Sequence, residues 1–386
     1  MQEKRLEKNR KRRPKTVILF TVVLLFAFAG CKKEKEEENV SAAVTPGVAA
    51  EGFADADEAL VKQRAEKNAA LTAVSVGDME ISMQKAMFLI YSMEVQGNSY
   101  AAFYKSQYGL DYWNMEYDEE GRTTSDVFKE ETIAALIQYA VLHDCAVKNG
   151  MGLTAEEIEE NIIFVEELKT LLTAEETERG GFTTENLREV CGWMMLGEKY
   201  YGMMTDSLGI TKESVRETIN KEDYKEYETE YLYLPFTYYD ENYNICEESE
   251  EVKESRRAQM QDYYEQVAAG VTFEELAVAD EALLHNTRTF LADGEEAEAS
   301  YMEAAVRLEV GEVCAPIETE YGVYLIRMVD DACTKTYEAT VEAEYELQRS
   351  EAFEAAYEVL LSEYEVQVNE EAWEDIILGA TVSLLE

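Results

Sequence analysis

The sequence is poor in proline, histidine and basic residues. Its 386 residues include 4 Pro and 2 His, and 35 Lys and Arg stand against 81 Asp and Glu, giving a formal net charge of −46. Nucleic-acid binding needs clustered Lys and Arg to contact phosphates, so this charge argues against a nucleic-acid partner. His143 and His285 are too few for a typical zinc site or a His-based nucleophile. We therefore expect no metal and no cofactor.

Cysteine is also scarce, and its spacing points to no site. There are 6 Cys and no CxxC pair, which predicts neither a disulfide framework nor a metal centre. With 20 Gly the chain is not collagen-like, and 46% hydrophobic residues exclude a wholly disordered protein. A chain of this length and apolar content is expected to form two or three domains with buried cores.

The N-terminus resembles a bacterial lipoprotein signal. A basic start precedes an apolar run over residues 17–29, interrupted only by Thr21. These 13 residues are too few for a comfortable membrane span and fit a secretory signal. The run ends in Phe28-Ala29-Gly30-Cys31, which is similar to a lipobox with Phe in place of the usual Leu. The resemblance implies cleavage after residue 30, lipidation of Cys31 (palmitate among its acyl chains), and an extracytoplasmic protein anchored to the cell membrane. The alternative is an ordinary signal anchor in which Cys31 is incidental.

The rest of the chain divides by pattern into four segments. Residues 31–56 are highly charged at first and then contain a Pro-Gly pair and several Ala, which predicts a flexible tether. Residues 57–225 are mostly helical in pattern, and residues 332–386 return to a helix and a short strand. Three capping boxes begin at Thr154, Thr173 and Thr272, and apolar spacing predicts a helix over residues 132–148. The Met- and Trp-rich stripe of residues 193–204 is typical of core packing, although an exposed Met-rich surface would suit a promiscuous peptide binder.

Residues 226–331 predict a compact α+β domain. Residues 228–234 alternate and are rich in β-formers, and Pro235 is expected to end that strand or mark an edge. Helices are expected over residues 256–269 and 273–277. Residues 315–318 and 323–329 then predict a hairpin around Tyr321 and Gly322.

Four stretches, in order along the chain, resemble extracytoplasmic foldases of the PrsA and SurA type. They are residues 73–82, 136–157, 209–215 and 301–326, of which the last is the strongest match. The resemblance implies an α+β protein in which a mostly helical chaperone domain, including a returning C-terminal segment, carries an inserted parvulin-type (PpiC) peptidyl-prolyl isomerase, or rotamase, domain. The implied partners are unfolded or exported polypeptides.

The parvulin-like part departs from its family at the active site. Two family His residues are replaced by Tyr231 and Tyr324, and only Asp280 is a candidate for the central Cys or Asp. Residues 287–291 stand in place of a Gly-Asp-Leu-Gly stretch. The resemblance assigns substrate binding to three positions, and the pocket Met of the family falls near Ala297. These three positions are Tyr301, Val306 and Phe290.

The sequence leaves three alternatives for the function of the protein. Prolyl isomerisation needs no nucleophile, because the amide must only twist over a barrier of about 18–20 kcal/mol. Tyr hydroxyls can donate and accept hydrogen bonds, so Tyr231 and Tyr324 preserve a network if catalysis survives. Alternatively, both are ordinary sheet aromatics in a domain that retains only peptide binding. A solute-binding or scaffold lipoprotein is the third alternative.

Overall fold

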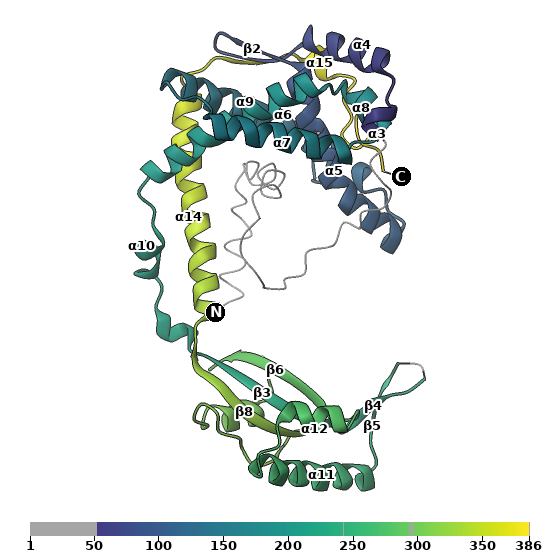
Figure 1. Ribbon diagram of the computed structural model, residues 1–386, viewed down its shortest axis with the longest axis vertical. Helices are drawn as coiled ribbons and strands as arrows, with labels where there is room; N and C mark the ends of the chain where they lie inside the picture. Colours follow the sequence, from purple (N-terminus) through teal and green to yellow (C-terminus); the bar gives the residue numbers. More distant parts are fainter. Residues whose placement is uncertain (1–51, 242, 293, 295–296, 386) are drawn as a thin grey trace. The chain divides into compact units, whose positions relative to one another are not determined.

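The computed structural model describes residues 52–241, 243–292, 294 and 297–385 (Figure 1). The signal segment of residues 1–30, Cys31 and most of the expected tether lie outside the described residues. Within the described part of the chain, no helix is long and apolar enough to cross a membrane.

The predicted C-terminal boundary of the tether, residue 56, is wrong. Residues Gly52–Asp55 form a short helix, α3, and Phe53 packs against the core of the first unit. The ammonium of Lys169 lies 5.0 Å from the centroid of the Phe53 ring. The side chain of Asp57 caps the next helix, α4 (Glu58–Ala69). Residues 52–56 are therefore part of the folded protein.

The chain forms two compact units. The first contains the described residues up to Gly209 together with residues 351–385, and the second is Ile210–Ser350. The second unit is thus an insertion into the sequence of the first. It includes residues 210–225 and 332–350 in addition to the 226–331 expected for the parvulin-like domain.

The first unit is mostly helical, with one small antiparallel sheet. Strand β1 lies between β2 and β9, so the start and the end of the unit meet in one sheet. Trp373 reinforces this pairing, because its indole N–H donates to the carbonyl of Ala73 at 3.1 Å. After α4 its elements are β1 (Thr72–Val76), β2 (Met79–Ser82), α5 (Met83–Tyr108), η1 (Tyr112–Asn114), α6 (Thr124–Lys148), α7 (Ala155–Leu171), α8 (Ala174–Gly180), α9 (Thr184–Ser207), the end of α14 (Lys335–Leu361) from residue 351 onward, β9 (Val366–Val368) and α15 (Glu370–Trp373).

Local capping explains where the helices begin. The capping boxes at Thr154, Thr173 and Thr272 are confirmed, each with a reciprocal pair of hydrogen bonds. Three further boxes begin at Thr123, Thr183 and Thr211, where Asp, Asn or Ser replaces the usual Glu. The helix expected over residues 132–148 accordingly starts earlier, at Thr124.

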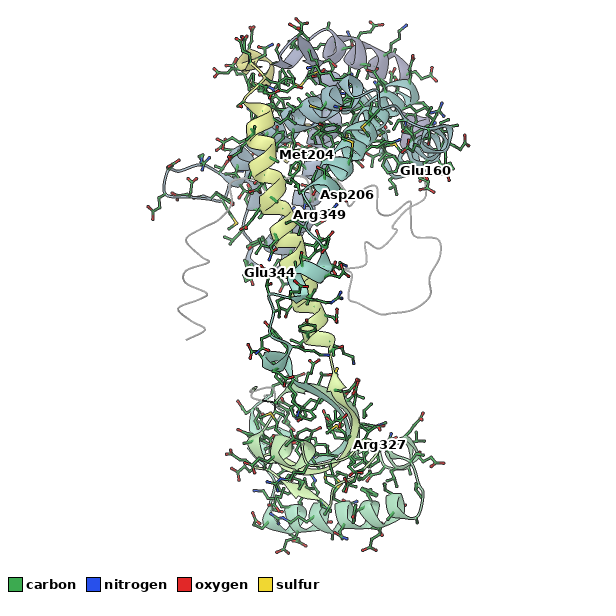
Figure 2. All side chains as sticks on the ribbon, turned by 90° about the vertical axis from the view of Figure 1, so that its left-hand side faces the viewer. Glu160, Met204, Asp206, Arg327, Glu344 and Arg349 are labelled. Atoms are coloured by element: carbon green, nitrogen blue, oxygen red, sulfur yellow. The ribbon has the colours of Figure 1, made fainter. Side chains whose placement is uncertain are left out.

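The methionine-rich stripe on α9 divides between core and surface. Trp193, Met194 and Leu196 are buried, which confirms the core-packing interpretation for them. Met203 is 44% exposed, and Met204, labelled in Figure 2, is half-buried. His143 lies within α6 and stacks obliquely near Trp193, with ring centroids 6.0 Å apart.

A buried carboxylate fixes the C-terminal segment of the first unit. Glu94, on α5, is fully buried, and its two oxygens accept four backbone N–H groups at 2.6–2.9 Å. Burial raises the pKa of Glu94, while the four N–H donors act to lower it. The four donors are Gly379, Thr381, Val382 and Ser383.

The second unit contains a four-stranded antiparallel sheet in the order β6-β3-β8-β7. The predicted strand, the helix at residues 273–277 and the hairpin are confirmed, and β3 ends at Pro235 as expected. Its elements are α10 (Lys212–Arg216), η2 (Lys221–Tyr224), β3 (Glu226–Pro235), β4 (Thr237–Tyr239), β5 (Ile245–Glu247), α11 (Glu250–Ala268), α12 (Phe273–Ala279), β6 (Leu284–Leu291), α13 (Ala299–Ala305), β7 (Ile317–Glu318), β8 (Gly322–Cys333) and the first part of α14 (Lys335–Leu361).

One expectation for the second unit needs correction, and three features were not expected. Helix α11 begins at Glu250 rather than at residue 256, because the Ser249 side chain caps it by accepting the N–H of Val252. Residues 287–291, for which no element was expected, are part of β6, which pairs along its whole length with β3. Helix α13 and the β4–β5 hairpin were not expected.

Candidate functional site

The central sheet of the second unit has two chemically different faces. Strand β3 alternates, so that Leu232 and Leu234 point to one side while Tyr231 and Tyr233 point to the other. Helices α11 and α12 cover the leucine face, where Met260 and Phe273 complete a buried cluster. Helix α13 packs on the tyrosine face. The candidate residues expected from the sequence must therefore be assigned to one face or the other.

Four tyrosines meet on the tyrosine face, and we call them the tyrosine cluster. The Tyr231 and Tyr324 rings lie 5.6 Å apart in an edge-to-face arrangement. Tyr301 from α13 contacts both, at 5.9 Å from Tyr231 and 5.2 Å from Tyr324. Tyr233 stacks on Tyr324 at 4.4 Å. The structure thus brings Tyr231, Tyr324 and Tyr301 together, and it adds Tyr233, which the sequence analysis missed.

The tyrosine cluster is packed rather than open. Tyr301 is 0% and Tyr324 is 4% exposed, whereas Tyr231 and Tyr233 are half-buried. The Tyr301 hydroxyl lies 2.8 Å from the hydroxyl of Thr229, and the Tyr233 hydroxyl donates to the carbonyl of Tyr321 at 2.7 Å. Two of the four hydroxyls are therefore engaged within the protein.

Burial raises the pKa of three phenols of the cluster. It raises the pKa of Tyr301 to about 12, against the opposing effects of the Thr229 hydrogen bond and the Arg288 guanidinium. Burial, and next the carboxylate of Glu298, raises the pKa of Tyr324 well above its usual range. The same two causes raise the pKa of Tyr233. At neutral pH these side chains are therefore hydrogen-bond donors without charge.

Two charged side chains border the tyrosine cluster. The guanidinium carbon of Arg288, on β6, lies 5.1 Å from the Tyr231 ring centroid and 4.9 Å from that of Tyr301. Glu298, at the N-cap of α13, has a buried Oε2 atom with no hydrogen-bond partner among the described residues. The tyrosine cluster therefore has a positive charge over two of its ring faces and a negative charge at the start of α13.

The remaining predicted residues lie apart or play packing roles. Phe290 is 1% exposed and contacts the Tyr301 ring at 6.2 Å, so it is a buried neighbour of the cluster. Val306, at the end of α13, is 38% exposed. Asp280 ends α12 on the leucine side, where it accepts a hydrogen bond from Tyr263 at 2.5 Å that lowers its pKa. The structure therefore does not bring Asp280 to Tyr231 and Tyr324.

A charged group occupies the leucine side of the sheet. Glu230 lies 2.6 Å from His285 and forms an ion pair with Arg327, which is labelled in Figure 2. The Arg327 guanidinium also lies over the Phe273 ring at 5.3 Å. Among the described residues, no group of three or more His, Cys, Asp and Glu side chains is placed to hold a metal ion.

Sequence signals existed for only some of the missed residues. The period of two in a strand places Tyr233 on the same face as Tyr231, so the spacing already predicts it. Arg288 reaches the cluster because it pairs with Thr229 across β6 and β3, and no local pattern indicates that register.

Residues 242–330 match the family described as Rotamase: PPIC-type PPIASE domain. This stretch contains α11, α12, β6, α13, β7 and most of β8, and therefore Tyr301 and Tyr324. Tyr231 on β3 lies before it.

A curated protein gives a longer match. The Foldase protein PrsA of Caldanaerobacter subterraneus subsp. tengcongensis is 25% identical over 233 residues, which cover 57% of this chain and 62% of that protein. The match thus spans less than two thirds of the relative's length. Together with the family match, it confirms the resemblance to PrsA-type foldases with a PPIC-type domain.

Two solved structures illustrate the similarity to known folds. PrsA from Bacillus subtilis is 16% identical, with 67% of this chain and 95% of that chain covered and a TM-score of 0.22. A SurA-like chaperone from Campylobacter jejuni is 12% identical, with 77% and 99% covered and a TM-score of 0.28.

Proposed function

We propose that this chain is an extracytoplasmic chaperone of the foldase type, anchored by a lipid at Cys31, that binds unfolded exported polypeptides. The observation that carries the proposal is the PPIC-type match over residues 242–330, within an inserted α+β unit. The lipobox-like ending at Cys31 supports the location and the anchor. The helical first unit takes the place of the chaperone domain in this proposal.

Within this function, we assign the PPIC-type domain to peptide binding without catalysis. Catalysis of prolyl isomerisation requires a dry pocket that admits the proline ring and donors that favour the twisted amide. Tyr301 and Tyr324 are almost fully buried and fill the tyrosine face themselves. The hydroxyls of Tyr301 and Tyr233 are engaged with protein atoms, which leaves fewer donors for a bound amide.

A second candidate is true peptidyl-prolyl isomerisation. The edge-to-face contact of Tyr231 and Tyr324 at 5.6 Å favours it, because both positions expected to replace the family His residues lie together.

The deciding experiment is a proline-limited refolding assay with the chain from residue 32 onward, which contains every described residue. We expect no acceleration above background, together with suppressed aggregation of a chemically denatured client. A parvulin of known activity serves as the positive control. A rate enhancement that disappears in Tyr231→Phe and Tyr324→Phe would support the second candidate instead. Failure to suppress aggregation at stoichiometric excess would overturn the chaperone assignment.

The solute-binding alternative has little support. Solute-binding proteins are built from alternating βα units around parallel sheets. Every strand pairing among the described residues is antiparallel. A scaffold that binds one fixed partner differs from a chaperone by indifference to unfolded chains, so the aggregation assay distinguishes these two as well.

A further inference from the structure

The end of helix α5 carries large aromatic side chains beyond the core. Ala101 is the last buried residue of this helix, and the helix continues for two further turns to Tyr108. Tyr100 and Phe103 are each 52% exposed, and Tyr108 is 62% exposed. Contiguous apolar surface of this kind is rare on soluble monomers and marks interaction sites.

These rings form one connected set, which we call the aromatic ladder: Tyr100, Phe103, Tyr104, Tyr108 and Tyr112. Tyr112 stacks on Tyr100 at 6.0 Å and on Tyr104 at 5.5 Å. Tyr108 contacts Tyr104 at 5.8 Å and Phe103 at 5.9 Å. The buried ring of Trp113 supports Tyr112 edge-on at 5.7 Å. The ladder is therefore held in place by ring contacts while its outer members face solvent.

A groove of about 540 Å³ lies beside the aromatic ladder and shares Tyr112 with it. The C-terminal segment forms its other wall, which the four hydrogen bonds to Glu94 hold in position. The groove has the volume of a site for a few side chains. Its apolar lining comes from Leu110, Tyr112 and Trp113 on one side and from Ile377, Leu384 and Leu385 on the other.

The chain that follows the ladder is acidic. Residues 111–131 contain eight carboxylates and two basic side chains. One of the two bases, Arg122, is already paired with Asp118 and Glu130. Burial raises the pKa of Tyr112, and the negative charge of the Glu131 carboxylate raises it further. Lys105 and Asp111 both line the groove, so the groove itself is balanced while its surroundings are negative.

We propose that the aromatic ladder and its groove bind extended segments of unfolded polypeptide in which Lys or Arg alternates with aromatic and other apolar residues. The inference rests on the proposed chaperone function and names its client class. Apolar side chains enter the groove, while cations meet the ring faces and the surrounding carboxylates. An acidic segment with the same apolar content meets like charge and binds weakly.

Two labelled peptides test the client class by fluorescence anisotropy with the chain from residue 32 onward. They carry identical Phe, Tyr and Leu residues, and Lys in one is replaced by Glu in the other. We expect the Lys peptide to bind at least tenfold more tightly, and added salt to shrink that ratio. Equal affinities for the two peptides would overturn the charge preference.

A pair of triple variants tests the location. The ladder variant combines Tyr100→Ala, Phe103→Ala and Tyr108→Ala. The control variant replaces three similarly exposed residues of α7 by Ala: Ile158, Ile163 and Leu171, at 49%, 50% and 72% exposure. We expect at least tenfold weaker binding of the Lys peptide in the ladder variant only. Circular dichroism melting of both variants checks that all the proteins compared are folded.

The outcomes separate this inference from the chaperone function. If the ladder variant keeps a denatured client soluble and binds the Lys peptide as the wild type does, the location is wrong while the chaperone function stands. If the wild type neither binds peptides nor suppresses aggregation, both proposals fail. If sedimentation shows a wild-type dimer that the ladder variant converts to a monomer with unchanged peptide binding, the ladder is a contact between copies and the inference is overturned.

Discussion

Tyr233 and Tyr324 stack with their ring centroids 4.4 Å apart and their planes 22° from parallel. They occupy directly paired positions on β3 and β8, so the strand register itself brings the rings together. The stack covers the tyrosine face at the position where the resemblance places a catalytic His.

The first prediction concerns Gly322, whose lack of a side chain leaves room for the Tyr233 ring. A Cβ atom at Gly322 would lie 2.2 Å from the Tyr233 ring and 2.5 Å from the carbonyl oxygen of Leu234. We expect Gly322→Ala to lower the free energy of unfolding by about 1–3 kcal/mol, because both neighbours must move. Urea denaturation measures the change.

Gly202→Ala is the matched control for this substitution. Gly202 lies in α9 with nothing within 4 Å of an added Cβ, so alanine should stabilise the helix by about 0.5–1 kcal/mol. A Gly322→Ala protein as stable as the wild type would show that the stack is not tightly packed.

The second prediction concerns the cation above the cluster. Arg288 lies over both Tyr231 and Tyr301, so Arg288→Gln should lower the free energy of unfolding by about 0.5–2 kcal/mol. Arg288→Lys should retain part of this contribution. Arg307→Gln is the control, since Arg307 forms only an exposed pair with Glu303 at 3.9 Å and should change little. Equal effects at both positions would contradict a cation–π role.

The third prediction is alkaline destabilisation through Tyr301. Burial raises the pKa of Tyr301 from 10.0 to about 12, so the folded protein holds this proton more tightly than the unfolded chain does. The resulting stability is fully present below pH 10 and is lost as the pH rises toward 12, with a size of roughly 2–3 kcal/mol.

Tyr301→Phe removes this contribution, so the stability of that variant should fall less steeply between pH 10 and 12. At neutral pH it should lose about 1 kcal/mol, the value of the hydrogen bond with Thr229. Chemical denaturation at several pH values measures both effects, with the exposed Tyr239→Phe as the control. An unchanged alkaline slope in Tyr301→Phe would refute the prediction.

The fourth prediction tests the buried carboxylate of the first unit. In Glu94→Gln the amide nitrogen would face backbone N–H groups that need an acceptor, so we expect a loss of about 2–4 kcal/mol. Hydrogen exchange should become faster at the amides of residues 379 and 381–383. Glu189→Gln, which removes an exposed pair with Lys85, should cost no more than about 1 kcal/mol. Unchanged exchange at these amides would falsify the role of Glu94 in fixing the C-terminal segment.

Regular elements could be predicted where a periodic pattern coincides with burial. The alternation in β3 and β8 and the capping boxes before α7, α8 and α12 are local, so the sequence is sufficient for them. Strand β6 was missed because it starts with largely exposed residues, including Leu284 and Asn286, and its strand character comes from pairing with β3.

The surroundings of the sites depend on contacts that no local pattern encodes. The partners of Glu94 lie 285 or more positions away in the chain. Tyr100, Tyr104 and Tyr108 have a helical spacing typical of an inward face, and only the folded structure reveals that the core ends at Ala101. Glu298 is likewise recognised as a neighbour of the tyrosine cluster only from the folded structure.

The pairing of β1 with β9 has a consequence for the order in which the two units can be completed. The side chains of Asn369 and Trp373 donate hydrogen bonds to backbone carbonyls 297 and 300 positions earlier, so the first unit stays incomplete until residue 373 has been synthesised. The inserted second unit, Ile210–Ser350, has by then been fully available to fold. A chain cut between residues 351 and 365 would therefore keep the complete second unit but lack β9, which leaves one edge of β1 without its partner strand.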